Sequence, residues 1–313
     1  MTTSVGGLQG VWADLLIPLN EDLSISHKKL ATHVRTLGAK GVEGVVLFGH
    51  AGEGNSFSAA ERLDAVKQLM AHGVAGKDIL LYAGFSNLTD SAQLIRATQA
   101  LGLRGCIVTP PVSDGGGTDQ GLVDYFIQIA QKTKDTGVKL FLSSLAQGGP
   151  TDLKPNVITE ILNQQPGVFQ GLIDQSRHAS HTTDWIRSFM SSLPVLSTND
   201  MNVHAIANLG IHVCISAYAN LIPGLMVKLV QSTAAQKVSV TGSKIGNEDE
   251  HLALFARLIE SLPEISALKF LMATQYRDSD WMRVRPPLSV LNHATHDQLT
   301  KEFKKFNQNS EAH

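Results

Sequence analysis

The sequence is poor in cysteine, in charge and in long apolar runs, and each shortage excludes a class of protein. Its 313 residues include only two cysteines, Cys106 and Cys214, too few for a disulfide framework. Both cysteines lie in apolar runs, where a buried free thiol is expected. Charged residues make up 17% and apolar residues 43% of the chain, a balance that excludes a disordered chain and a coiled coil.

Signals for export, membranes or nucleic acid are also lacking. The start of the chain, Met-Thr-Thr-Ser-Val-Gly-Gly, has neither the basic nor the apolar region of a signal peptide. No window reaches the roughly eighteen uninterrupted apolar residues of a membrane span. The net charge of −2 gives no general attraction to nucleic acid or to anionic membranes. We therefore expect a cytoplasmic protein that binds neither nucleic acid nor membranes.

What the chain does have is an alternation of short apolar runs with longer amphipathic stretches. The runs are apolar at consecutive positions, which is typical of strands buried on both faces. Between them, Ser58 and Glu61 form a predicted capping box at a helix start, and a helix over Thr89–Leu101 is predicted to end at Gly102. The eight runs cover residues 11–18, 42–48, 79–83, 105–108, 138–142, 168–173, 194–196 and 213–216.

Eight strand–helix alternations predict a parallel sheet, and their number favours a closed barrel. No Gly-rich dinucleotide fingerprint follows the first run, which argues against an open doubly wound sheet. After Leu221 the pattern becomes purely helical, over residues 224–235, 248–261, 264–273 and 295–306. The predicted fold is α/β, a (β/α)8 TIM barrel over residues 1–222 with a C-terminal helical region over residues 223–313 packed on it.

Several motifs at the predicted strand ends resemble one enzyme family. Residues 49–53, Gly-His-Ala-Gly-Glu, and the helix start at residues 56–62 are similar to the Gly-Thr-Thr-Gly-Glu loop and Leu-Thr-x-x-Glu-Arg segment of the dihydrodipicolinate synthase/N-acetylneuraminate lyase family. Further similar segments follow in the family's order through nearly the whole chain, at residues 83–89, 109–111, 120–122, 196–200, 215–220 and 285–288. The resemblance implies a TIM barrel and a homo-oligomer, either a dimer or a tetramer.

The positions that carry the family's chemistry are different in this sequence. Family enzymes form a Schiff base on a lysine in the sixth strand, where Ile173 stands here, and no lysine occurs between Lys154 and Lys228. Leu142 stands at the position of the family's tyrosine, and the threonine pair is replaced by His50 and Ala51. Isoleucine offers no nucleophilic nitrogen, so the usual imine cannot form at position 173.

Polar residues that remain at the strand ends are the candidates for a reworked site. His50 is the candidate general base, predicted to turn into the barrel mouth close to Leu142 and Ile173. Arg177 is a candidate anchor for an anion. The other predicted pocket residues are Gly49, Ala51, Gly52, Glu53, Leu142, Ser143, Ile173, Asp174, Asn199 and Ile215. In the family, the position of Glu53 helps to structure its loop.

No metal or other cofactor is predicted. Asp174, His178 and His181 have a spacing that could bind zinc or manganese, but a His-x-x-His pair without a third fixed ligand is a weak signal.

Two functions follow from this pattern. The first is a lyase or aldolase that acts on a small 2-oxo acid or related carbonyl compound without the lysine Schiff base. The second is a non-catalytic paralogue with a binding, regulatory or assembly role, which the apolar Ile173 and Leu142 favour. In both cases the expected partner is an oxo-acid-like small molecule.

Overall fold

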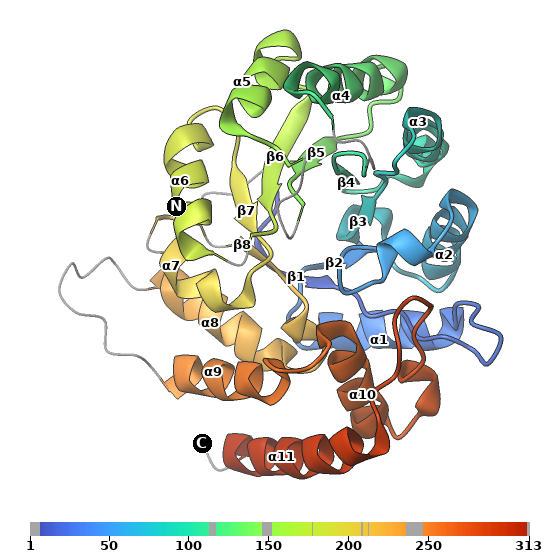
Figure 1. The fold of residues 1–313 in the computed structure, drawn as a ribbon, viewed down its shortest axis with the longest axis vertical. Coiled ribbons are helices and arrows are strands. Elements are labelled where there is room, and N and C mark those ends of the chain that lie inside the picture. Colours follow the sequence, from blue (N-terminus) through green and yellow to red (C-terminus); the bar gives the residue numbers. More distant parts are fainter. Residues whose placement is uncertain are drawn as a thin grey trace.

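Eight parallel strands close into a barrel in chain order, as Figure 1 shows for this computed structural model. The structure describes residues 7–112, 117–145, 152–176, 178–207, 209–211, 213–235 and 247–311. The closed barrel with helices between its strands confirms the predicted fold class. The strands are β1 (Gly10–Asp14), β2 (Gly44–Leu47), β3 (Ile79–Tyr82), β4 (Gly105–Val108), β5 (Leu140–Ser143), β6 (Phe169–Asp174), β7 (Val195–Ser197) and β8 (Val213–Ser216).

The strands form where the sequence has consecutive apolar residues because both of their faces are covered. Nearly every strand residue is buried, on one side by the barrel interior and on the other by the helices. β1 pairs with β8 and so closes the sheet, with Trp12 opposite Ile215. A Cβ at Gly44 would lie 2.4 Å from the Trp12 ring, so this position in β2 has room only for glycine.

The helices that surround the barrel begin and end largely as predicted. Ser58 and Glu61 form the capping box of α2. The helix predicted over Thr89–Leu101 is the α-helix α3 as far as Ala97, followed by a 3₁₀ turn and by Gly102 at a φ of 60°. The ring consists of α1 (His27–Ala39), α2 (Ala59–Ala71), α3 (Leu88–Ala97), α4 (Asp119–Thr133), α5 (Pro155–Gln164), α6 (Ala179–Phe189), α7 (Val203–Ala207) and α8 (Pro223–Ala235).

Three further helices, α9 (Asn247–Ile259), α10 (Glu264–Tyr276) and α11 (His293–Glu311), pack together at the β1–β2 side of the barrel (Figure 1). They enclose a second hydrophobic core built around Phe255, Leu268 and Phe303. Leu16 and Ala51, from the segments that follow β1 and β2, belong to the same core. The C-terminal helices therefore cover one side of the barrel mouth. The predicted boundary between residues 222 and 223 stays a prediction, and α8 packs directly against β1 and β8.

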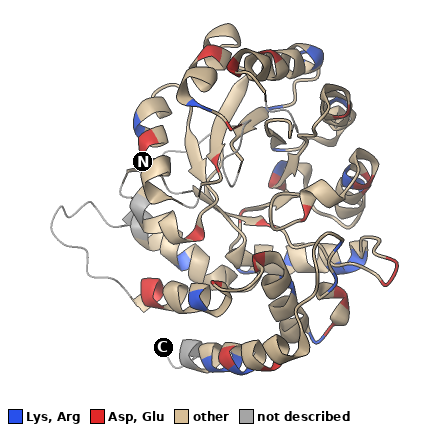
Figure 2. Cartoon of the chain, viewed as in Figure 1, with Lys and Arg blue, Asp and Glu red and all other residues tan. Residues whose placement is uncertain are grey.

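Both signs of charge are interspersed on the outer helices, as Figure 2 shows, in agreement with the small net charge. Among the described residues, no helix combines the length and the apolar character that a bilayer crossing requires.

Candidate functional site

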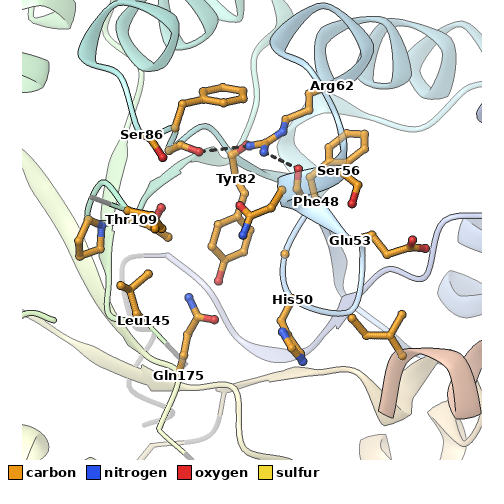
Figure 3. Close-up of a pocket in the computed structure, with 18 of the residues that line it drawn as sticks. Phe48, His50, Glu53, Ser56, Arg62, Tyr82, Ser86, Thr109, Leu145 and Gln175 are labelled. Carbon is orange, nitrogen blue, oxygen red and sulfur yellow. Dashed lines mark hydrogen bonds between the residues drawn. The ribbon is translucent and has the colours of Figure 1, made fainter. Parts of the chain in front are cut away.

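Two neighbouring cavities open at the carboxyl ends of the strands, the end of a TIM barrel that carries its active site. The first, shown in Figure 3, has a volume of about 320 Å³ and lies over the ends of β2, β3 and β4. The second has a volume of about 500 Å³ and lies between the ends of β1, β7 and β8 and helices α9 and α10. His50 and Gln175 line both cavities, so the two are parts of one mouth.

The loop after β2 wraps around the carboxylate of Asp14, which ends β1. A Cβ at Gly49 would lie only 2.3 Å from Asp14 Oδ1, so glycine is required for this close approach. The backbone N–H of Ala51 donates a 3.0 Å hydrogen bond to Asp14 Oδ2. Gly52 is also closely packed, since a Cβ at this position would lie 2.8 Å from the carbonyl oxygen of Leu15. The small residues around His50 therefore fix the loop onto β1.

His50 extends from this loop into the mouth. Its side chain is 47% exposed, and its Nε2 lies 3.7 Å from Glu264 Oε2 at the start of α10. Such a half-exposed imidazole beside a carboxylate can reach a bound molecule and exchange a proton with it.

Two buried carboxyl groups face the second cavity. Burial raises the pKa of Asp14 to about 6; the Ala51 N–H and His50 oppose this shift and Glu264 adds to it. Burial likewise raises the pKa of Asp200 to about 7, against hydrogen bonds from the Ser216 hydroxyl and the Tyr218 N–H. Within the described part of the chain, Oδ1 of each aspartate has no hydrogen-bond partner. Carboxyl groups that titrate near neutral pH are suited to donating and accepting protons.

An uncharged chain of hydrogen bonds crosses the floor between the cavities. Gln175 Nε2 donates to Ser143 Oγ at 2.8 Å and to the Ser144 carbonyl at 2.8 Å. The Tyr82 phenol is hydrogen-bonded to Ser143, and burial raises the pKa of Tyr82, which keeps the phenol protonated. Both N–H groups of the Gln175 amide and the Ser143 hydroxyl are used within this chain, so the floor carries no charge and is held by its own hydrogen bonds.

Glu53 ties the loop to the C-terminal helices. Its Oε1 forms a 2.5 Å ion pair with Lys269 Nζ on α10, and both side chains are fully buried. Its Oε2 accepts a 2.8 Å hydrogen bond from the backbone N–H of Arg285. Burial lowers the pKa of Lys269, and Glu53 opposes that shift. Lys269 lines neither cavity, so its amine holds the loop at the mouth in place through Glu53 and does not face the cavities.

The structure brings some of the predicted site residues together at the cavities and separates others. Gly49, His50 and Glu53 line the first cavity, and His50, Asn199 and Ile215 line the second. Ala51 and Gly52 hold the loop on β1, as described above. Leu142, Ser143 and Ile173 are fully buried in the barrel and line neither cavity.

Asp174 lies on the opposite side of β6 from the mouth. Its carboxylate accepts a 2.6 Å hydrogen bond from Thr182 Oγ1 and lies 3.1 Å from His181 Nδ1, both on α6. Neighbouring strand residues face opposite sides of a sheet, so Asp174 faces the helices while Gln175 faces the mouth. Arg177 lies outside the described residues, and those residues contain no group of three or more His, Cys, Asp or Glu side chains that could hold a metal ion.

Sequence reasoning missed several residues that line the cavities. Asp14 and Tyr82 end apolar strands, and this position alone could have marked them as candidates. Gln175 directly follows β6, and this position, too, marks it as a candidate. Arg62 and Glu264 come from helices whose placement at the mouth depends on tertiary packing.

Comparison with known proteins agrees with this architecture. The Dihydrodipicolinate synthetase family matches residues 7–306. The chain belongs to this family. A related aldolase of Saccharolobus solfataricus, named 2-dehydro-3-deoxy-phosphogluconate/2-dehydro-3-deoxy-6-phosphogalactonate aldolase, is 25% identical over 96% of this chain and 94% of its own length. The 4-hydroxy-tetrahydrodipicolinate synthase of Aromatoleum aromaticum is 23% identical over 73% of this chain and 76% of its own.

Solved structures of this family share the fold. The crystal structure of dihydrodipicolinate synthase from Agrobacterium tumefaciens superposes with a TM-score of 0.84 at 21% identity, covering 96% of this chain and 99% of that one. Family membership and the curated relatives support a lyase-type activity in the broad sense.

Proposed function

We propose that the protein is a lyase or aldolase that acts on a small 2-oxo acid or related carbonyl compound by acid–base catalysis, without a lysine Schiff base. The observation that carries the proposal is the cluster at the second cavity. There, His50 and Glu264 stand beside two buried carboxyl groups with raised pKa values, Asp14 and Asp200. No lysine is found among the described residues that line either cavity.

The proposed reaction requires the groups of this cluster to transfer protons. In the cleavage direction, His50 removes the proton of the substrate hydroxyl, and the carbon–carbon bond breaks as the hydroxyl carbon becomes the carbonyl of an aldehyde. The electron pair of that bond moves into the enolate of the 2-oxo fragment, which then takes the proton back from His50 at C3. A protonated Asp200 carboxyl is suited to stabilise the enolate oxygen by a hydrogen bond. Asp200 is assigned this role because its raised pKa keeps a large fraction of the carboxyl protonated near neutral pH.

The size of the mouth and the relatives support a small substrate. Cavities of 320 and 500 Å³ lie in the range of small-molecule sites. Curated relatives are named as an aldolase of phosphorylated sugar acids and as a synthase of hydroxy-tetrahydrodipicolinate. Neither name fixes the substrate here, because each describes the relative and not this chain.

Exchange of the C3 protons of pyruvate in deuterated buffer tests the proposal without knowledge of the aldehyde partner. Proton NMR should show that the wild-type protein speeds the exchange, since enolate formation is the step that the cluster catalyses. The His50→Ala variant should slow it by roughly 10²- to 10⁴-fold, the usual contribution of a general base. His72→Ala, an exposed histidine at the end of α2, is the matched control and should exchange like the wild type. Wild-type protein without exchange activity, or His50→Ala with undiminished activity, would overturn the proposal.

The second candidate function is a non-catalytic, ligand-binding paralogue. It is favoured by the side chains of Ile173 and Leu142, which are fully buried and apolar where the family places its reactive groups. Pyruvate binding without any proton exchange is the outcome that this alternative predicts.

A further inference from the structure

The guanidinium of Arg62 lies at the first cavity, and the described residues offer it no acidic partner. Arg62 is 2% exposed and is held by the main-chain carbonyls of Tyr82 and Gly54, at 2.8 and 2.6 Å, with a longer contact to Gly84 at 3.4 Å. Its carbon Cζ lies 4.1 Å from the centre of the Phe85 ring. A guanidinium has five N–H donors, and Nε has no partner within the described part of the chain. The described residues therefore hold Arg62 by main-chain carbonyls alone, and its buried positive charge is not neutralised by them.

The other charges around this cavity cancel one another. Glu53, the one acidic residue among the described residues that line it, is neutralised by Lys269. Arg285, which packs behind the loop, is paired with Glu61 at 2.7 Å. Arg62 has no such pair among the residues that the structure describes, and burial lowers its pKa to about 10. An unpaired buried charge is costly, so an anion that enters the cavity would relieve that cost.

Two hydroxyl groups lie on the same side of the cavity and have no hydrogen-bond partner in the described structure. Ser86 follows β3 and Thr109 follows β4. Thr109 Oγ1 packs against Gly84, where a Cβ would lie 2.4 Å away, and the carbonyl of Gly84 in turn contacts Arg62. In Figure 3, Arg62 and Ser86 lie at the top of the cavity and Thr109 at its left, while His50 lies below them.

We propose that the first cavity is an anion subsite in which Arg62, Ser86 and Thr109 bind a carboxylate or phosphate group of the substrate. The inference rests on the proposed function for its assumption that the ligand reaches from this subsite to His50. It divides the mouth into an anion-binding part and a proton-transferring part. Arginine suits the first part because its planar donors match carboxylate and phosphate oxygens.

Calorimetric titration with pyruvate and, separately, with inorganic phosphate tests the subsite. The wild type should bind at least one of these anions, and the tighter one identifies the source of the charge; neutral methyl pyruvate should bind more weakly than pyruvate. The Ser86→Ala/Thr109→Val double variant should bind the preferred anion about tenfold more weakly or worse, since it lacks two hydrogen bonds to a charged group. Arg62→Met should abolish measurable binding.

Because Arg62 also holds loop carbonyls, the double variant decides the matter if Arg62→Met fails to fold. Thr89→Val, an exposed threonine in the first turn of α3 that does not line the cavity, is the matched control and should bind like the wild type. The subsite is refuted if the wild type binds neither anion or if the double variant binds with unchanged affinity. Failure of the proposed function is distinguishable: proton exchange would then survive in His50→Ala, while anion affinity still depends on Ser86 and Thr109.

Discussion

The two cavities share His50 and Gln175 but differ in the charge that surrounds them. In the first, the acid is paired with a buried lysine, and the guanidinium of Arg62 is held by main-chain carbonyls and has no acidic partner in the described part of the chain. In the second, the carboxyl groups of Asp14, Asp200 and Glu264 gather around His50. The comparison suggests that a barrel without a sixth-strand amine can still separate the tasks of binding an anion and moving a proton.

The largest loss of stability is expected when the buried ion pair between Glu53 and Lys269, beside the first cavity, is broken. Lys269→Met leaves the Glu53 carboxylate buried without its counter-ion and should lower the free energy of unfolding by about 3–5 kcal/mol. Urea unfolding measures the change. The exposed pair Arg96–Asp135 is the control, because Arg96→Met should cost less than about 1 kcal/mol. Equal losses in the two variants would show that the buried pair does not brace the mouth.

Adding Glu53→Gln to Lys269→Met should recover much of the stability, since the second change removes the orphaned charge. A double variant as unstable as Lys269→Met alone would instead place the loss in packing around α10.

At Asp200, in the second cavity, the free energy of unfolding should depend on pH in the opposite sense to that of an acid whose pKa is lowered by an ion pair. The pKa of Asp200 is raised in the folded state, so its burial costs nothing at low pH and weakens the fold as pH rises from about 4 to about 7. Asp200→Asn should therefore gain stability relative to the wild type between pH 4 and pH 8, by up to about 4 kcal/mol. Urea unfolding over this pH range tests the claim, and a difference that does not change with pH would contradict it.

A smaller loss of stability is expected from a substitution in the loop after β2, which lies at both cavities. Gly49→Ala places a methyl group on Asp14 Oδ1 and should destabilise the protein by about 1–3 kcal/mol, measured by thermal unfolding. Gly38→Ala on α1, where a Cβ meets nothing within 4 Å, is the matched control and should stabilise by about 0.5–1 kcal/mol. If both alanines were tolerated alike, the close contact between the loop and β1 would not be essential.

The sequence was sufficient to predict the barrel because its signals are local and repeated. Consecutive apolar residues marked each strand, and Ser58 and Glu61 marked the start of α2. The position of His50 at a strand end was likewise visible from the order of residues, since strand ends meet at one face.

The partners of His50 could not be predicted in the same way. Glu264 is 214 positions further along the chain and reaches the mouth only because α10 packs on Ala51 and its neighbours. The raised pKa values of Asp14 and Asp200 depend on burial, which no local motif encodes. The place of Asp174 at a strand end predicted a pocket residue, yet strand alternation turns its side chain to α6.

The central claim is that proton transfer at this mouth needs no amine. It is tested most directly by treating the protein with pyruvate and borohydride, removing both, and then measuring the exchange of pyruvate C3 protons. The account predicts that the intact mass stays unchanged and that the exchange rate equals that of untreated protein, because no lysine lines either cavity in the described residues. A stoichiometric covalent adduct together with loss of exchange would contradict it and establish an imine mechanism.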